Sequence, residues 1–212
     1  MRTCTAAFFS GRGYYSTIGQ SLPGTGLCAD VVSVLPIVRE LHLRANMGFA
    51  PCGVLQHIIG KDWVPVSQIA KDSGYKPQFV GAILEEAAQN GWVELDLTSV
   101  PRCRSVNYRI PARECIAAFI GDCSLAKKLD SLAGYRGVFN QVYFVFDVPI
   151  DDETTDAIAS NGYGILRFYE KYGSFLEHIP AGTEETEDIK KLSVIAENVL
   201  FENIWLRKDE LI

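Results

Sequence analysis

The sequence lacks any apolar run approaching 18 residues, so it predicts no membrane-spanning helix and no membrane partner. The N-terminal stretch MRTCTAAFFSGRG has an apolar centre, but Ser10, Gly11 and Arg12 interrupt it too early for a secretory signal. We therefore expect a cytoplasmic protein.

Familiar metal and catalytic motifs are also missing. The six cysteines, at positions 4, 28, 52, 103, 115 and 123, include no C-x-x-C pair, and the three histidines are scattered at 42, 57 and 178. This spacing favours free, buried thiols over a zinc site or a disulfide framework. No G-x-x-x-x-G-K-[ST], G-x-S-x-G or H-E-x-x-H motif occurs, which argues against the corresponding phosphate-binding and hydrolase chemistries.

Charge is distributed unevenly along the 212 residues, of which 48% are hydrophobic. Residues 147–212 hold fifteen Asp/Glu against six Lys/Arg, a net charge of −9, whereas the preceding residues are near +3. We expect the acidic part to form solvated helix faces that do not meet nucleic acid. The length allows one substantial core or two small ones.

The stretch from Val64 to Ile110 has the most informative pattern. It predicts a helix over Val64–Gly74, ended by a glycine, and a second helix that begins at Lys76-Pro77. The apolar stripe of this second helix repeats at helical spacing, in Val80, Ile83, Leu84 and Ala87. Strands are expected over Trp92–Leu95 and over Ser105–Ile110, where Val106, Tyr108 and Ile110 alternate. Residues 48–60 supply a helix upstream.

This order of three helices and a two-stranded hairpin resembles a winged helix, a module that often binds duplex DNA. The resemblance implies that Lys76 and Gln78 approach a groove and that Arg102 and Arg104 meet phosphate. Residues 45–113, however, hold seven Lys/Arg against six Asp/Glu, and Glu85 and Glu86 oppose deep insertion of the helix. The alternative is a protein-interaction or dimerisation module, which exposed Phe79 and Trp63 would favour.

The flanking segments predict an α/β (α+β) domain interrupted by this insertion. Strands are expected over residues 29–36, 114–120, 141–149 and 163–170, with helices over residues 124–139, 151–162 and 182–208. Because strands and helices alternate after residue 114, those strands should pair in parallel. We assign residues 1–44 and 114–212 to this discontinuous domain and residues 45–113 to the insertion.

Residues 12 to about 180 resemble the restriction-endonuclease-like, or PD-(D/E)xK, superfamily, a mixed sheet flanked by helices. Asp30 opens a core strand as the family's aspartate does, and the glycine pair of Gly162-Tyr163-Gly164 matches its closing strand. Glu114 stands at the glutamate of the E-x-K motif, where Ile116 replaces the lysine. The resemblance implies that Asp30 and Glu114 bind Mg²⁺, and that Lys127 or Lys128 substitutes for the missing lysine.

The competing interpretation is structural: Asp30 bonds locally and Glu114 pairs with Arg113 or another cation. On balance the sequence predicts a non-enzymatic protein that binds double-stranded DNA through the winged helix, on a degenerate nuclease-like scaffold. A Mg²⁺-dependent nuclease with a displaced catalytic lysine is the alternative. Either protein could form homo-oligomers.

Overall fold

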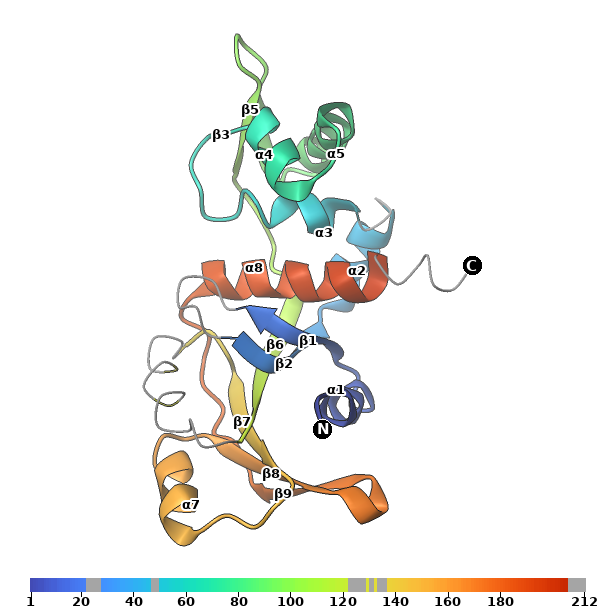
Figure 1. Ribbon diagram of the computed structural model, residues 1–212. Coiled ribbons are helices and arrows are strands. Elements are labelled where there is room, and N and C mark those ends of the chain that lie inside the picture. Colours follow the sequence, from blue (N-terminus) through green and yellow to red (C-terminus); the bar gives the residue numbers. More distant parts are fainter. Residues whose placement is uncertain (22–27, 47–49, 122–128, 130–131, 133–136, 206–212) are drawn as a thin grey trace. The chain divides into compact units, whose positions relative to one another are not determined.

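A computed structural model of the chain describes residues 1–21, 28–46, 50–121, 129, 132 and 137–205 (Figure 1). The chain divides into two compact units, the first combining Met1–Leu35 with Glu114–Leu192 and the second combining Pro36–Arg113 with Ser193–Ile212. Residues 36–44 and 193–212, which we had assigned to the discontinuous domain, thus belong to the same compact unit as the insertion. None of the described helices has the length and apolar character needed to cross a membrane.

The first unit contains a mixed six-stranded sheet of order β1-β2-β6-β7-β8-β9. Its strands are β1 (Tyr15–Ser21), β2 (Cys28–Pro36), β6 (Ala112–Ile120), β7 (Gln141–Phe146), β8 (Gly164–Tyr169) and β9 (Ser174–Ile179). β6 pairs with β7 and β7 with β8 in parallel, which confirms the prediction from alternating strands and helices. The two edge strands, β1 and β9, pair antiparallel with their neighbours and were not predicted.

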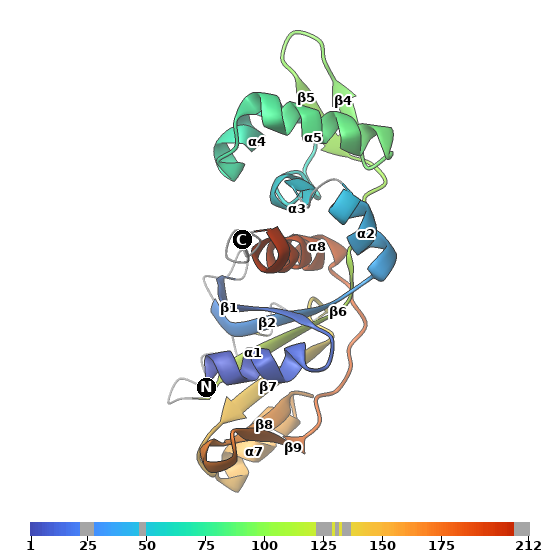
Figure 2. The ribbon, with the colours of Figure 1, turned by 90° about the vertical axis from the view of Figure 1, so that its right-hand side faces the viewer.

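Helices flank this sheet. α1 (Arg2–Ser10) lies across one face, where Phe9 joins Val31, Tyr143 and Leu166 in a buried cluster (Figure 2). α7 (Asp152–Ala159) lies on the other side of β7 and β8 (Figure 1) and begins where the Asp151 carboxylate accepts a 2.7 Å hydrogen bond from the Thr154 amide. A 3₁₀ turn, η2 (Glu170–Tyr172), links β8 to β9. Most of the helix expected over residues 124–139 lies outside the described residues.

The second unit packs helices against a three-stranded antiparallel sheet of order β3-β5-β4. In chain order it contains α2 (Val38–Asn46), α3 (Ala50–Leu55), β3 (Val64–Pro65), α4 (Val66–Ser73), α5 (Pro77–Gln89), β4 (Val93–Asp96) and β5 (Arg102–Ser105). α8 (Ile189–Leu200) begins in the first unit, continues in the second and ends in a π-helical turn, η3 (Phe201–Trp205).

The local helix signals in this unit are confirmed. α4 ends at Gly74, whose φ of +73° suits a residue without a side chain, and Pro77 occupies the first turn of α5. The predicted stripe of α5 is buried, in Val80, Ile83, Leu84 and Ala87. These side chains join Ile58, Ile69 and Trp92 in one apolar core.

The strand expected over Ser105–Ile110 is wrong, because β5 covers Arg102–Ser105 instead. Cys103, at the centre of β5, is the side chain that enters the core, while Val106 is exposed. Tyr108 is partly buried because it packs against the apolar core of this unit, and its hydroxyl donates to Glu197 on α8. The alternation of residues 106–110 therefore does not correspond to a pleated strand.

Candidate functional site

Asp30, the predicted metal ligand near the start of β2, has a protein partner for each of its two carboxylate oxygens. Its Oδ1 accepts a 2.7 Å hydrogen bond from Arg2 Nε and forms an ion pair with Arg2 Nη2 at 2.6 Å, and its Oδ2 accepts a 2.8 Å hydrogen bond from the Ile120 amide. The residue is 8% exposed. These contacts link α1, β2 and β6, so Asp30 has structural partners, but they lie 28 and 90 residues away and are not the local groups that the structural interpretation predicted.

Glu114 does not approach Asp30. It lies six residues before Ile120 on β6, which places it about 20 Å from the Asp30 contact at roughly 3.3 Å per residue. Its carboxylate accepts a 2.6 Å hydrogen bond from the Tyr14 hydroxyl. Burial, followed by that hydrogen bond, raises the pKa of Tyr14 well above its ordinary value of 10. The partner of Glu114 is thus a tyrosine and not Arg113.

Among the described residues, the part of β6 that contacts Asp30 has no second carboxylate and no lysine. The residues of β6 around the contact are Ala118, Phe119 and Ile120, and none has a polar side chain. Within the described part of the chain, no group of three or more His, Cys, Asp or Glu could hold a metal ion. Lys127 and Lys128 lie outside the described residues. The predicted pairing of Asp30 with Glu114 around Mg²⁺ is therefore not supported by their geometry.

The two wing arginines are paired with acids on the neighbouring strand. Arg102 donates to Asp96 at 2.8 Å, and Arg104 donates twice to Glu94, at 2.9 Å and 2.7 Å. Both guanidinium groups also lie over the Trp63 ring, at 5.1 Å and 4.9 Å from its centre. Hydrogen bonds from Thr98 and Arg102 hold the pKa of Asp96 below its ordinary value. Cross-strand pairing therefore neutralises the charge that was expected to meet phosphate.

Lys76 and Gln78 are exposed at the start of α5, where the sequence placed them. Further along the same helix, Glu85 and Glu86 are also exposed, so the outward surface of α5 is not basic. Phe79 is 42% exposed and packs edge-on against Tyr75. One cation and two acids on this helix provide little attraction for a polyanion.

An apolar groove runs between the start of α4, α5 and the β4–β5 hairpin, and the sequence analysis missed it. Its volume is about 410 Å³, and its apolar lining comes mainly from Val66, Pro77, Leu84, Leu95, Leu97 and Val100. Leu97 is 64% exposed and Val100 is 57% exposed, whereas Glu85 is the charged residue of the lining. Two aliphatic residues within a turn, in Leu97-Thr98-Ser99-Val100, were the available signal.

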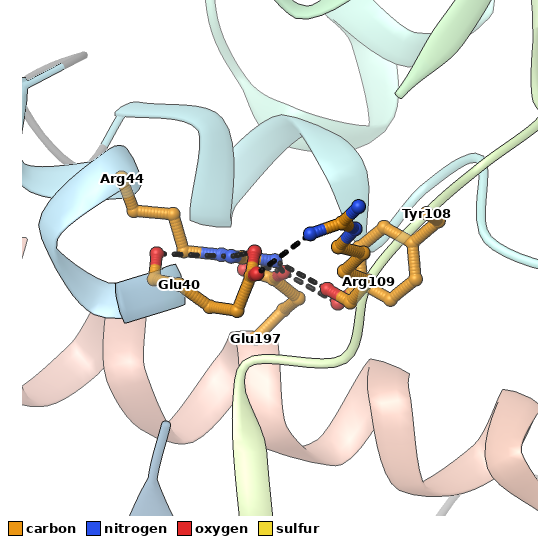
Figure 3. Close-up of polar contacts among 5 residues, drawn as sticks. All are labelled: Glu40, Arg44, Tyr108, Arg109 and Glu197. Atoms are coloured by element: carbon orange, nitrogen blue, oxygen red, sulfur yellow. Dashed lines mark hydrogen bonds and ion pairs between the residues drawn. The ribbon is translucent and has the colours of Figure 1, made fainter. Parts of the chain in front are cut away.

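A buried polar cluster, also unforeseen, joins α2, α8 and residues 108–109 within the second unit (Figure 3). Arg44 and Glu197 have fully buried side chains and form an ion pair at 2.5 Å. Arg44 also donates to the backbone carbonyls of Glu40 and Arg109, each at 3.1 Å, and Tyr108 donates to Glu197 at 2.5 Å. The cluster fixes the residues that follow β5 against both helices.

Comparison of the chain with protein-family models, curated proteins and solved structures returns no match. The contacts described above are therefore the basis for the functional inference.

Proposed function

We propose that this chain is a non-enzymatic binding protein whose second unit is a winged helix. The order α3, β3, α4, α5, β4, β5, with β5 at the centre of the small sheet, supports this assignment. In it, α4 and α5 form the helix-turn-helix and the β4–β5 hairpin is the wing. The first unit would then be a degenerate restriction-endonuclease-like scaffold.

The contacts of Asp30 support a function without nuclease chemistry. Phosphodiester hydrolysis of this type needs carboxylates that converge on a metal ion and a cation beside the attacking water. Asp30 instead faces an apolar stretch of β6 and is bonded to Arg2 and to a backbone amide. We infer that the first unit supports a binding function and does not cleave DNA at this position.

The observation that carries the proposal is the apolar groove beside α5. Concave, mostly apolar surfaces of this volume are typical of binding sites. Covering Leu97 and Val100, which are 64% and 57% exposed, would contribute about 1–2 kcal/mol each, since complete burial of such a side chain contributes about 1.5–3 kcal/mol. A ligand that fills the groove thus gains affinity from shape and apolar contact.

The chemistry of the groove supports, as its partner, a protein segment with aliphatic side chains and a flanking Lys or Arg. Glu85 lines the groove, and Glu85 and Glu86, the next residue of α5, are both exposed. A basic side chain next to aliphatic anchors would complement that rim. A DNA phosphate would be repelled at the same place, and the wing arginines are already paired with Glu94 and Asp96.

Duplex DNA is the second candidate because Lys76 and Gln78 are exposed at the beginning of α5, where a recognition helix contacts base edges. The wing ion pairs are also exposed, and such pairs contribute little, so a phosphate could displace the carboxylates. In this case binding would weaken steeply with salt.

A peptide selection tests the first candidate. Random 12-residue peptides displayed on phage are selected on the whole protein and then titrated by fluorescence anisotropy. We expect sequences that combine Leu or Ile with Lys or Arg. Their affinity should fall at least tenfold in Leu97→Asp/Val100→Asp, and Glu85→Lys should weaken them further. Val106→Asp is the matched control, because Val106 is an exposed aliphatic residue of the same unit outside the groove.

Labelled duplex DNA is titrated in parallel over a salt series. DNA binding that is lost in Lys76→Ala/Arg102→Ala/Arg104→Ala would favour the second candidate over the first. Peptides that bind Leu97→Asp/Val100→Asp as tightly as the parent protein would overturn the groove as their site. Self-association that is lost in the same double variant would make a second copy of the chain the occupant.

A further inference from the structure

The second unit contains another hollow, here called the arginine pocket, which shares no lining residue with the apolar groove. Its volume is about 700 Å³, within the range of small-molecule sites. The side chains that matter for its chemistry are those of Arg39, Asn90, Trp92, Asn107, Tyr108 and Arg109. They come from α2, from the residues after α5 and from the residues after β5, so they are far apart in the sequence.

The charge of the pocket is positive. Arg39 and Arg109 are the charged residues of its described lining, and both are exposed. Arg39 forms no ion pair with the described residues, whereas Arg109 has a long contact to Glu40 at 3.8 Å (Figure 3). Arg44, close by, is compensated by Glu197. Two guanidinium groups thus remain available to an anion.

The buried cluster holds the walls of this pocket in place. Arg44 donates to the Arg109 carbonyl at 3.1 Å, and its guanidinium lies 5.0 Å from the centre of the Trp92 ring and 5.7 Å from that of Tyr108. Glu197 in turn accepts from the Tyr108 hydroxyl. The Trp92 and Tyr108 side chains and the backbone of Arg109 are therefore held in place, which lowers the cost of ordering this part of the pocket around a ligand.

Uncharged groups beside the arginines provide further hydrogen bonds. The side-chain amide nitrogen of Asn90 donates to the Glu86 backbone carbonyl at 2.9 Å. This bond orients the Asn90 side chain and leaves the Asn90 amide oxygen as an acceptor. Asn107 also lines the pocket and is exposed. Amide groups of this kind suit the hydroxyl groups of a sugar.

We propose that the arginine pocket binds a small organic phosphate, with Arg39 and Arg109 on the phosphate group and Asn90 and Asn107 on its organic part. A phosphate monoester has a charge between about −1.5 and −2 at pH 7, which matches two guanidinium groups. Guanidinium also presents paired donors that fit phosphate oxygens. This site does not depend on the groove or on its partner.

Isothermal titration of the whole protein with ribose 5-phosphate, AMP, inorganic phosphate and citrate tests the proposal. We expect ribose 5-phosphate or AMP to bind more tightly than inorganic phosphate. Arg39→Gln and Arg109→Gln should each weaken binding at least tenfold, whereas Arg113→Gln, an exposed arginine of the same unit outside the pocket, should leave it unchanged. Unfolding midpoints in urea check that each variant is folded.

Three results would overturn the proposal. The first is that no probe binds more tightly than about 1 mM. The second is that both glutamine variants bind as the parent protein does, which would place the ligand elsewhere. The third is tighter binding of citrate than of any phosphate, which would replace the ligand class by carboxylates. None of these results bears on the peptide titrations, so the proposal for the groove and the proposal for the arginine pocket are tested independently.

Discussion

The buried ion pair of Arg44 and Glu197 predicts how the stability of the second unit responds to the loss of either charge. Both side chains are fully buried, and they join α2 to α8 across 153 residues of sequence. We consider three variants, Arg44→Met, Glu197→Met and the double variant, which together form a double-mutant cycle. Methionine keeps much of the side-chain length and removes the charge.

The expected magnitudes follow from what each change leaves behind. Arg44→Met leaves the Glu197 carboxylate buried without its guanidinium and removes the donor of the Glu40 and Arg109 carbonyls. Breaking a buried pair in this way costs about 3–5 kcal/mol. Glu197→Met costs less, because Glu40 stays 3.7 Å from Arg44. The double variant removes both charges, so its cost should be at least about 2 kcal/mol below the sum of the single costs.

Tryptophan fluorescence in urea is a suitable assay, because all three tryptophans, at 63, 92 and 205, belong to the second unit. Arg39→Met is the matched control, an exposed arginine on the same helix, and should change the free energy of unfolding by less than about 0.5 kcal/mol. Single costs that add in the double variant would refute the buried ion pair.

Three further predictions concern other parts of the molecule. Phe144 is fully buried next to Phe119, so Phe144→Ala should lower the free energy of unfolding by about 3–5 kcal/mol in thermal melts followed by circular dichroism. Burial lowers the pKa of His57 below 6.5, so the folded state favours neutral imidazole and stability should fall as pH decreases through 6.5. Urea midpoints at pH 7 and pH 5 should show a smaller decrease in His57→Gln. Burial raises the pKa of Cys103 to about 12, so a thiol reagent at pH 8 should label exposed Cys4 at once and Cys103 only on unfolding.

Local signals made much of the fold predictable. A glycine ends α4, a proline begins α5, and the apolar residues of α5 repeat every three to four positions. These signals span only a few residues, and both helices lie where the sequence predicts them. The parallel strands β6, β7 and β8 followed from chain order, because a helix between two strands returns the chain to the same edge. These features could be predicted because they follow from residue spacing and from the order of elements, without knowledge of which side chains meet.

The candidate site was less predictable because it depends on register between strands. Asp30 and Glu114 each occupy an expected strand, but the residue of β6 that contacts Asp30 is Ile120, six positions beyond Glu114. Spacing along one strand cannot specify that offset. Tyr108 was misassigned for a similar reason, since its partner Glu197 is 89 residues away.

The arginines of the second unit show why formal charge was a poor guide to its partners. Residues 45–113 have an excess of one positive charge, yet Arg102 and Arg104 are paired on the wing with Asp96 and Glu94. Arg39, outside that range, and Arg109, with its long contact to Glu40, keep the most available charge. The groove beside α5 is left with aliphatic side chains and a glutamate. The two surfaces therefore favour ligands of opposite charge, and an organic phosphate in the arginine pocket should not compete with a basic peptide in the groove.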